Sequence, residues 1–466
     1  MNNKNTVFLL SSSLLLLTAG SACASNIHDY NRTNNEGKFN VYVRAVHIDT
    51  RIKNELIEDR FGGFPFGERL GGTALGLVAD YNSGYWRDSI GFDASFYGVA
   101  KLDARPENRD LFDDTSGDSE GFAKLGQANI KLRHAGENWS ALLQTGRGRF
   151  DAGTVVTLDT RAVPGSLQGA RGQIQVDGLD IGPLPGVLSV DGAYFNRVSP
   201  RDREDFEHIR SNGGLEIDDI KTFSIGYDAK LFALKFAQGV AKEFNRNTSY
   251  TLTLRAPLGE RGGAILETQY YDFRRDGDVW ERDWLSGDAA YDNKANWLNV
   301  NLGLEIDHWS FGLSYSKTRA ELSNGMLGYA FFDHGENVDG LMDAWTRSGN
   351  DFNNDGEKTW QLAGKYEFDG KSIAGIPLDG FNVMAIFKRG RFDADDPFSG
   401  MRTDVRESQA EYRLNYRFEE QDYQGMSVGV IYTRYWIDQN FVALVSAQPN
   451  NVVNGKELRM YVDYAF

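Results

Sequence analysis

The carboxyl-terminal segment 456–466 is the sequence feature that most constrains the fold. Apolar or aromatic residues occupy every second position in it, namely Leu458, Met460, Val462, Tyr464 and Phe466. Alternate side chains of a β-strand point to opposite faces, so the segment predicts a strand with one apolar face and one polar face. A strand of this kind that ends on an aromatic residue is typical of the strand that closes a bacterial outer-membrane barrel. The alternative is an edge strand of a secreted β-sandwich.

The opposite end of the chain has the pattern of an export signal. Lys4 precedes an apolar run from Val7 to Leu17, and Ala22-Cys23-Ala24 has the form of a signal-peptidase site. We therefore expect residues 1–24 to be cleaved and residues 25–466 to form one barrel domain.

The single cysteine, Cys23, is also the place where a lipoprotein would be acylated. That alternative is weak, because Gly20 stands where an aliphatic residue would be required. Cleavage after Ala24 would leave a mature chain without cysteine, which suits an oxidising compartment.

The composition excludes several other classes of protein. The chain has 29 Phe, 21 Tyr and 51 Gly, but its apolar residues alternate with polar ones, and no segment after the signal is long and apolar enough for a membrane-spanning helix. Its formal net charge of −16 argues against a nucleic-acid partner, which would need a basic face. The pattern favours strands that each expose only one face to lipid.

Between Phe39 and Phe466 the alternation predicts eighteen strands, with sixteen as the alternative. Long polar connections and short turns follow one another, and Asp307-His308 alone separates two strands of a tight hairpin. We therefore expect an all-β, antiparallel transmembrane β-barrel in the outer membrane of a Gram-negative bacterium. Both termini then lie at the short-turn end, which we expect to be periplasmic.

The faces predicted to point inward are polar. One late strand carries Gln409, Glu411, Arg413, Asn415 and Arg417, and the closing strand carries Glu457, Arg459 and Asp463. Polar inner faces predict a lumen that contains water. The connection from Arg147 to Gln168 is too apolar in its middle for a loop exposed to water, so we expect it to fold into the lumen as a constriction loop.

Four segments of the chain resemble one protein family. The resemblance to OprD-type outer-membrane porins lies in Thr160–Gly169 of the constriction loop, Asp80–Trp86 with Gly91–Asp93, Asn350–Leu362 and the closing strand Leu458–Tyr464. Within that family, which includes substrate-specific channels and chitoporins, the second and third of these segments are most similar to chitoporins.

The resemblance implies a passive, narrow channel that selects solutes by the charge of its lumen and acts as a monomer, with a trimer as the alternative. Inward parity then places several arginines on one wall with acids facing them across the opening. The expected pore-lining and constriction residues are Arg44, Asp93, Arg147, Arg149, Asp151, Asp159, Arg161, Arg413, Arg417 and Arg459.

A row of guanidinium groups could pass a carboxylate or the polar edge of a sugar along the wall. The alternative is that each arginine only neutralises a neighbouring acid. Ser427, Gly429 and Thr433 stand where further basic residues would be expected, which moves the expected solute from small anions toward sugars. We expect passive diffusion of small polar solutes, with chito-oligosaccharides preferred to amino acids or small carboxylates.

The remaining motifs predict no catalytic residue, metal or cofactor. Asp351-x-Asn353-x-Asp355-Gly356 imitates the start of an EF-hand, but Leu362 stands where a glutamate is required, so turn formation is the expected role and a looser calcium site stays open. The six histidines have no ligand spacing. An outer-membrane barrel hydrolase and a secreted sheet protein or adhesin are the alternatives from other functional classes.

Overall fold

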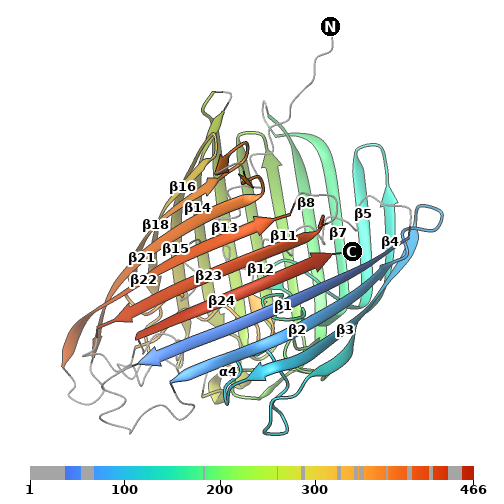
Figure 1. Cartoon of the computed structure of the whole chain (residues 1–466). Coiled ribbons are helices and arrows are strands. Elements are labelled where there is room, and N and C mark those ends of the chain that lie inside the picture. The colour runs from blue at the N-terminus through green and yellow to red at the C-terminus, as the bar shows by residue number, and fades with distance from the viewer. Residues whose placement is uncertain are drawn as a thin grey trace.

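The computed structural model describes residues 37–53, 68–181, 184–259, 261–284, 289–322, 327–340, 345, 351–373, 376–395, 401–418, 423–438 and 454–465. The expected signal peptide, residues 1–24, and the terminal residue Phe466 lie outside the described residues. Within them, the chain forms one antiparallel β-barrel with tilted strands (Figure 1).

The barrel wall consists of eighteen long strands. They are β1 (Lys38–Lys53), β2 (Arg69–Asn82), β3 (Ile90–Ala104), β4 (Phe122–Ala135), β5 (Trp139–Gly148), β7 (Ser166–Ile181), β8 (Leu184–Ser199), β11 (Ile220–Ala229), β12 (Phe232–Ala241), β13 (Asn245–Pro257), β14 (Gly262–Arg275), β15 (Lys294–Ile306), β16 (Trp309–Arg319), β18 (Lys358–Glu367), β21 (Phe381–Asp395), β22 (Arg402–Arg417), β23 (Met426–Ile437) and β24 (Asn454–Ala465). Short elements decorate the connections: β6 (Val155–Val156), β9 (Glu207–Arg210), β10 (Glu216–Ile217), α4 (Asp278–Arg282), β17 (Asp339–Gly340), β19 (Ser372–Ile373) and β20 (Ile376–Pro377).

The closing strand seals the sheet. β24 pairs in antiparallel register with both β23 and β1, from Tyr42 opposite Ala465 to Lys53 opposite Asn454. Closure satisfies the edge N–H and C=O groups, which hydrocarbon cannot hydrate. The expected barrel of eighteen strands is confirmed, and the alternative of sixteen is wrong. In the described part of the chain, no helix is long and apolar enough to cross a bilayer.

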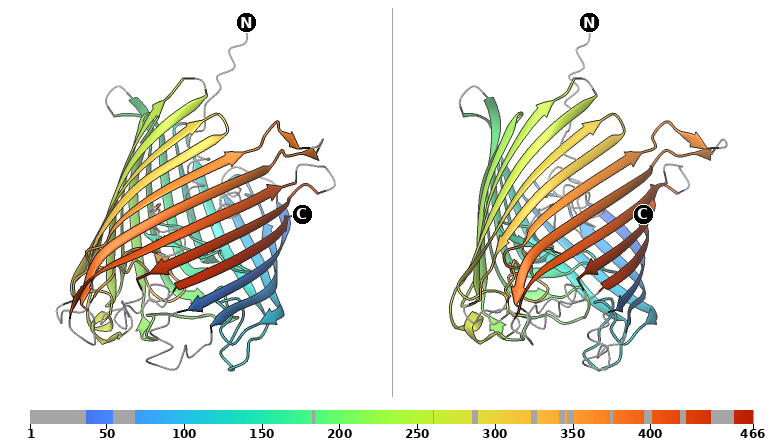
Figure 2. Two further views of the ribbon diagram at one scale, coloured as in Figure 1. Left: turned by 60° about the vertical axis from the view of Figure 1, so that its left-hand side comes forward. Right: turned by 90° about the vertical axis from the view of Figure 1, so that its left-hand side faces the viewer.

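The two ends of the barrel differ in their connections. The long connections gather at the lower end in Figure 1 and Figure 2, and the tight turns lie at the other end. The expected alternation of long and short connections is not strict. Only residues 242–244 join β12 to β13 at the long-loop end, and residues 368–380 at the short-turn end include the small hairpin of β19 and β20.

The apolar and polar residues that alternate in the sequence point alternately to the outer and inner faces of the barrel wall. On β16, Phe311 and Leu313 are 42% and 43% exposed on the outer face, whereas Ser314 and Ser316 point inward and are buried. The polar inward-facing residues are buried and the apolar outward-facing residues are exposed, which is the reverse of the pattern in a soluble protein. It is the pattern expected of a barrel surrounded by lipid.

The inner face is not polar throughout, in contrast to the expectation. Val46 and Ile48 of β1 point inward and are fully buried beneath loop residues that include Leu111, Phe112 and Val163. A larger apolar cluster forms where loop residues pack on the wall of β7, β8, β11, β12, β14 and β15. Its members include Phe150, Val155, Trp280, Phe331 and Trp297. Long loops therefore fill part of the bore and cover apolar patches of the inner wall.

Candidate functional site

The inner wall of β22, β23, β24 and β1 carries two parallel rows of charge. The strand register places one row across the four strands as Glu411, Thr433, Glu457 and Thr50. The next inward-facing row, displaced toward the short-turn end, is Arg413, Ile431, Arg459 and Ile48. Alternation along each strand therefore sets an acidic row directly beside a basic row.

Each arginine of these rows forms an ion pair with the acid two residues before it. Arg413 Nε donates to Glu411 Oε1 at 2.5 Å, and Arg459 Nε donates to Glu457. The side chains of Arg413 and Arg459 remain 11% and 25% exposed. Guanidinium groups that are paired but still partly open can contact a solute while the wall stays close to neutral.

Arg44 of β1 connects this wall to the segment between β5 and β7. Its Nε donates to Asp463 Oδ1 at 2.8 Å, and its Nη1 lies 3.4 Å from Asp159 Oδ1. The rings of Tyr42 and Tyr461 flank its guanidinium at 5.2 and 5.7 Å. Asp159 thus lies beside Arg44, not across the opening from it as expected.

The segment 149–165 between β5 and β7 folds into the bore. On one side, Thr154 N donates to Thr222 Oγ1 of β11 at 2.8 Å; on the other, Arg44 Nη1 of β1 donates to Arg161 O at 3.0 Å. Val155 and Ala162 are buried. The segment therefore contacts opposite parts of the wall and narrows the lumen, as the sequence predicted.

Gly76 of β2 gives this segment the room to lie against the wall. A Cβ at this position would come within 2.0 Å of Ala162 O. Only a residue without a side chain permits so close an approach of two backbones.

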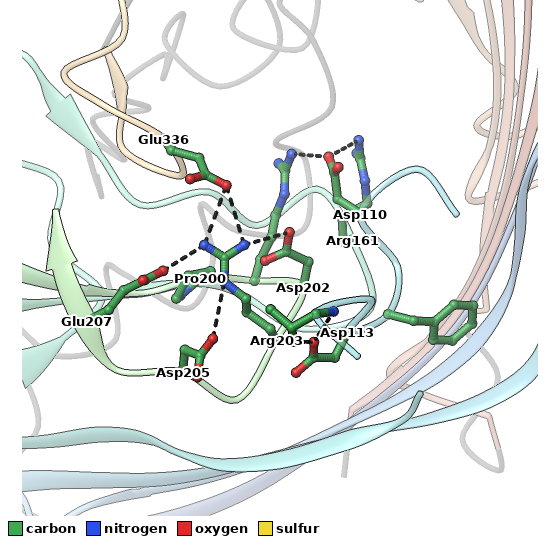
Figure 3. A network of polar contacts seen from close by, with 12 residues as sticks. Asp110, Asp113, Arg161, Pro200, Asp202, Arg203, Asp205, Glu207 and Glu336 are labelled. Atoms are coloured by element: carbon green, nitrogen blue, oxygen red, sulfur yellow. Dashed lines mark hydrogen bonds and ion pairs between the residues drawn. The ribbon is translucent and has the colours of Figure 1, made fainter. Parts of the chain in front are cut away.

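A second segment of the bore supplies the partner of Arg161. Asp110, in the connection between β3 and β4, lies 3.2 Å from Arg161 Nη2 and 2.9 Å from Arg201 Nη2 (Figure 3). Burial alone would raise the pKa of Asp110, but the charges of Arg161, Arg201 and Arg109 outweigh it and lower the pKa to about 2. Asp110 therefore stays ionised and joins three loops.

Arg203 is the centre of an acidic cluster next to this junction. The carboxylates of Glu207, Glu336, Asp202 and Asp205 surround it (Figure 3). Their oxygens lie 2.6–3.5 Å from its guanidinium nitrogens. Lys124 of β4 fixes the same loop by donating to Pro200 O and to Arg203 O. Acids therefore outnumber the cation around Arg203, whereas arginines outnumber the acid around the neighbouring Asp110.

A third loop is tied to the constriction segment. β17 pairs with β6, and His334 Nε2 lies 2.8 Å from Thr154 Oγ1. His334 Nδ1 lies 3.1 Å from Asn245 Oδ1, and the ring is fully buried. This arrangement suits a neutral ring that donates to Asn245 and accepts from Thr154.

Three of the remaining predicted site residues, Arg149, Asp93 and Asp151, have a polar partner. Arg149 lies 2.8 Å from Asp80 of β2, and Asp93 of β3 lies 2.6 Å from Lys131 of β4. Asp151 accepts a hydrogen bond from Thr157 N at 3.0 Å, which shapes the turn of the constriction segment. Arg417 faces inward near the short-turn end and forms no ion pair with the residues the structure describes.

The expectation for Arg147 is corrected. β5 extends to Gly148, and the register sets Arg147 opposite Ala128, on the outer face that also carries Leu143. Its guanidinium lies 3.5 Å from the ring of Phe206 and donates to Leu125 O. Because β5 includes Arg147 and Gly148, the side chain of Arg147 points outward and does not line the lumen.

Several residues of the site were missed by sequence reasoning. Lys131 shares the inward parity of its strand and could have been found by that signal. Asp110, Arg109 and Arg201 lie in loops, where no periodicity indicates which way a side chain points. Arg109 Nη2, for example, lies 3.3 Å from Glu457 Oε2, although the two residues are far apart in the sequence.

The segment that imitates an EF-hand forms a turn, as expected. Asp355 Oδ1 accepts from Ala320 N at 2.8 Å, and Asn353 donates to Ala330 O at 2.6 Å. Across the described residues, no group of three or more His, Cys, Asp or Glu side chains is placed to hold a metal ion.

Comparison with known proteins identifies the family. A search of curated protein sequences found no match. Among solved structures, the fold is similar to OccAB3 of Acinetobacter baumannii (18% identity, 92% of this chain and 99% of that chain, TM-score 0.69) and to OccAB1 of the same organism (14%, 92% and 96%, 0.72). It is also similar to OpdK of Pseudomonas aeruginosa in a structure with vanillate (15%, 92% and 98%, 0.69). The model of the outer membrane porin, OprD family, matches residues 35–466. The chain therefore belongs to the OprD family of outer-membrane porins, which are substrate-specific channels of Gram-negative bacteria and not enzymes.

Proposed function

We propose that the protein admits small polar solutes of low net charge by passive diffusion, with its long-loop end outside the cell and both termini in the periplasm. The observation that carries the proposal is the wall of paired rows, in which Arg413 and Arg459 are partly open and each is matched by an acid. A bare arginine row would favour anions. Alternating donors and acceptors instead suit the hydroxyl and amide groups of a sugar.

Chito-oligosaccharides are the first proposed substrate class, and amino acids or small carboxylates are the second. The paired wall supports neutral sugars over simple anions. Vanillate in the OpdK structure favours the second class. Trp297 faces the lumen side but is fully covered, so it offers no open surface for stacking a sugar ring.

A liposome-swelling panel with chitobiose, arginine and benzoate tests the proposal. The double variant Arg413→Gln/Arg459→Gln is expected to slow entry of the preferred solute several-fold. The matched control, Arg434→Gln, removes a cation from the outer face of β23 and should leave entry unchanged. Equal entry through both variants would contradict a role for the paired wall.

Orientation and assembly have separate tests. A thiol introduced by Asp118→Cys at the long-loop end should react with an impermeant reagent on intact cells, whereas one introduced by Lys371→Cys at the short-turn end should not. The opposite result would reverse the proposed orientation.

One barrel provides a complete pathway, so we propose a monomer. Light scattering of the purified protein distinguishes a monomer from a trimer.

A further inference from the structure

The outer face of β15, β16, β18, β21, β22 and β23 carries three successive kinds of side chain toward the long-loop end. The first register row is apolar and exposed, with Leu302, Leu313, Leu362 and Phe387. The second contains the aromatic residues Tyr315, Trp360 and Trp436, with Arg389 and Ser408 between them. The third is basic and consists of Lys317, Lys358, Arg391 and Arg406, which we name the cationic row.

The cationic row places like charges directly opposite one another on neighbouring strands. Lys317 faces Lys358, Lys358 faces Arg391, and Arg391 faces Arg406. Direct cross-strand contacts between like charges destabilise a sheet. In a chain with a net charge of −16, such a row is not a consequence of an excess of basic residues.

The protein itself compensates only part of this charge. Asp404 lies 2.6 Å from Arg391 and 3.3 Å from Arg406, whereas Lys317 and Lys358 form no ion pair with any described residue. The side chains of Arg391 and Arg406 are 67% and 52% exposed, and Lys358 is exposed. Most of the row is therefore open to an external anion.

The neighbouring rows indicate where that anion lies. Apolar side chains face the hydrocarbon, and Tyr and Trp gather at the level of the lipid headgroups. Trp360 contacts Tyr315 with ring centroids 4.8 Å apart, and Arg434 lies over Trp436 at 4.8 Å. The register places the cationic row just beyond this aromatic band, at the level where charged headgroups begin.

We infer that the cationic row binds the phosphate groups of lipopolysaccharide, the glycolipid of the outer leaflet, on the lipid-facing side of β16, β18, β21 and β22. Lysine binds phosphate as a point charge and arginine as a two-pronged donor, so the row can hold more than one phosphate. The inference rests on the proposed orientation, which puts the long-loop end in the outer leaflet, but not on the identity of the transported solute.

The test compares the intact protein with two double variants in detergent, using purified lipid A, lipid A without its phosphates, and inorganic phosphate as probes. Lys317→Gln/Lys358→Gln removes two cations that form no ion pair with the residues the structure describes. Lys230→Gln/Lys371→Gln removes two exposed lysines at the short-turn end. Native mass spectrometry measures the bound lipid, while heat-modifiable gel mobility and single-channel conductance confirm that each barrel is folded and open.

The apparent dissociation constant of lipid A is expected to rise roughly 30-fold in Lys317→Gln/Lys358→Gln and to stay unchanged in the short-turn control. The unmodified protein should bind dephosphorylated lipid A at least tenfold more weakly, and inorganic phosphate should not compete at the same concentration. Equal binding of both lipids by the unmodified protein, equal loss in both variants, or competition by inorganic phosphate would each overturn the inference. If a variant still conducts but these binding results are not obtained, the lipid site is refuted and the channel function is not. A wrong orientation would be detected separately by the surface labelling of the introduced thiols.

Discussion

Neutralising Glu457 should convert the paired wall into an anion-selective one. Glu457 accepts a hydrogen bond from Thr50 Oγ1 at 2.6 Å, pairs with Arg459, and lies 3.3 Å from Arg109. Glu457→Gln keeps the shape and the capacity to accept hydrogen bonds but leaves one more positive charge at the wall.

The size of the effect follows from Coulomb's law. A monovalent ion about 7 Å from one uncompensated charge in water changes its energy by about 0.6 kcal/mol, a factor of about 2.7 in local concentration. Anions gain this factor and cations lose it, so the ratio of anion to cation permeability should rise about sevenfold. Arg459→Gln should shift the ratio in the opposite direction by a similar amount.

Reversal potentials in planar bilayers under a potassium chloride gradient measure this ratio directly. Asp404→Asn, which removes an acid from the outer face of β22, is the matched control and should leave the ratio unchanged. Shifts of the same sign in Glu457→Gln and Arg459→Gln, or a shift in the control as large as in Glu457→Gln, would refute the assignment of these residues to the ion pathway.

Substitutions at Gly76, Lys131 and His334 test the contacts that hold the constriction segment, the inner wall and the loop beside them in place. Gly76→Ala should push Ala162 off the wall and change the single-channel conductance, whereas Gly172→Ala, with no atom within 4 Å of the added Cβ, should not; equal conductance in both would contradict the close approach. Lys131→Met should lower the free energy of unfolding by about 3–5 kcal/mol in urea titrations, because buried Asp93 loses its cation, and Lys131→Met/Asp93→Asn should recover most of it. Burial lowers the pKa of His334 to about 4 despite Asp339, so the folded state binds fewer protons than the unfolded state between about pH 6.5 and pH 4. Packing of the segment 327–340 should therefore be complete above about pH 6.5 and weaken by about 1.4 kcal/mol per pH unit down to about pH 4; proteolysis of this segment at pH 7.5 and pH 4.5 checks it, and His334→Gln should cleave equally at both.

The strands could be predicted because alternation is local information. Ile90, Phe92 and Phe96 face lipid while Asp93 and Ser95 face inward, as the two-residue period requires. Closure followed from the same pattern, since a sheet in hydrocarbon cannot keep free edges.

The partners of the arginines could not be predicted in the same way. Asp110 reaches Arg161, and Arg109 reaches Glu457, only because a loop between β3 and β4 folds into the bore. Loops have no period that fixes the direction of a side chain. The error at Arg147 has the same origin: the sequence does not show that β5 continues to Gly148, and the position of a strand end decides the face.

The balance between paired and unpaired arginines also depends on the fold. The sequence left open whether the arginines form a track or neutralise neighbouring acids. The structure combines the two, because Arg413 and Arg459 are paired with acids and still partly exposed.

The most direct test of the account asks which face of the wall meets water. Cys23 is the only cysteine of the chain, so a protein produced without residues 1–24 can carry a single introduced thiol. Thr433→Cys lies in the acidic row between Glu411 and Glu457, and Leu313→Cys lies on the outer face of β16. In a planar bilayer, a cationic, membrane-impermeant thiol reagent should reduce the single-channel current of Thr433→Cys and leave that of Leu313→Cys unchanged. Modification of Leu313→Cys with no effect on Thr433→Cys would contradict a water-filled path lined by the polar faces of these strands.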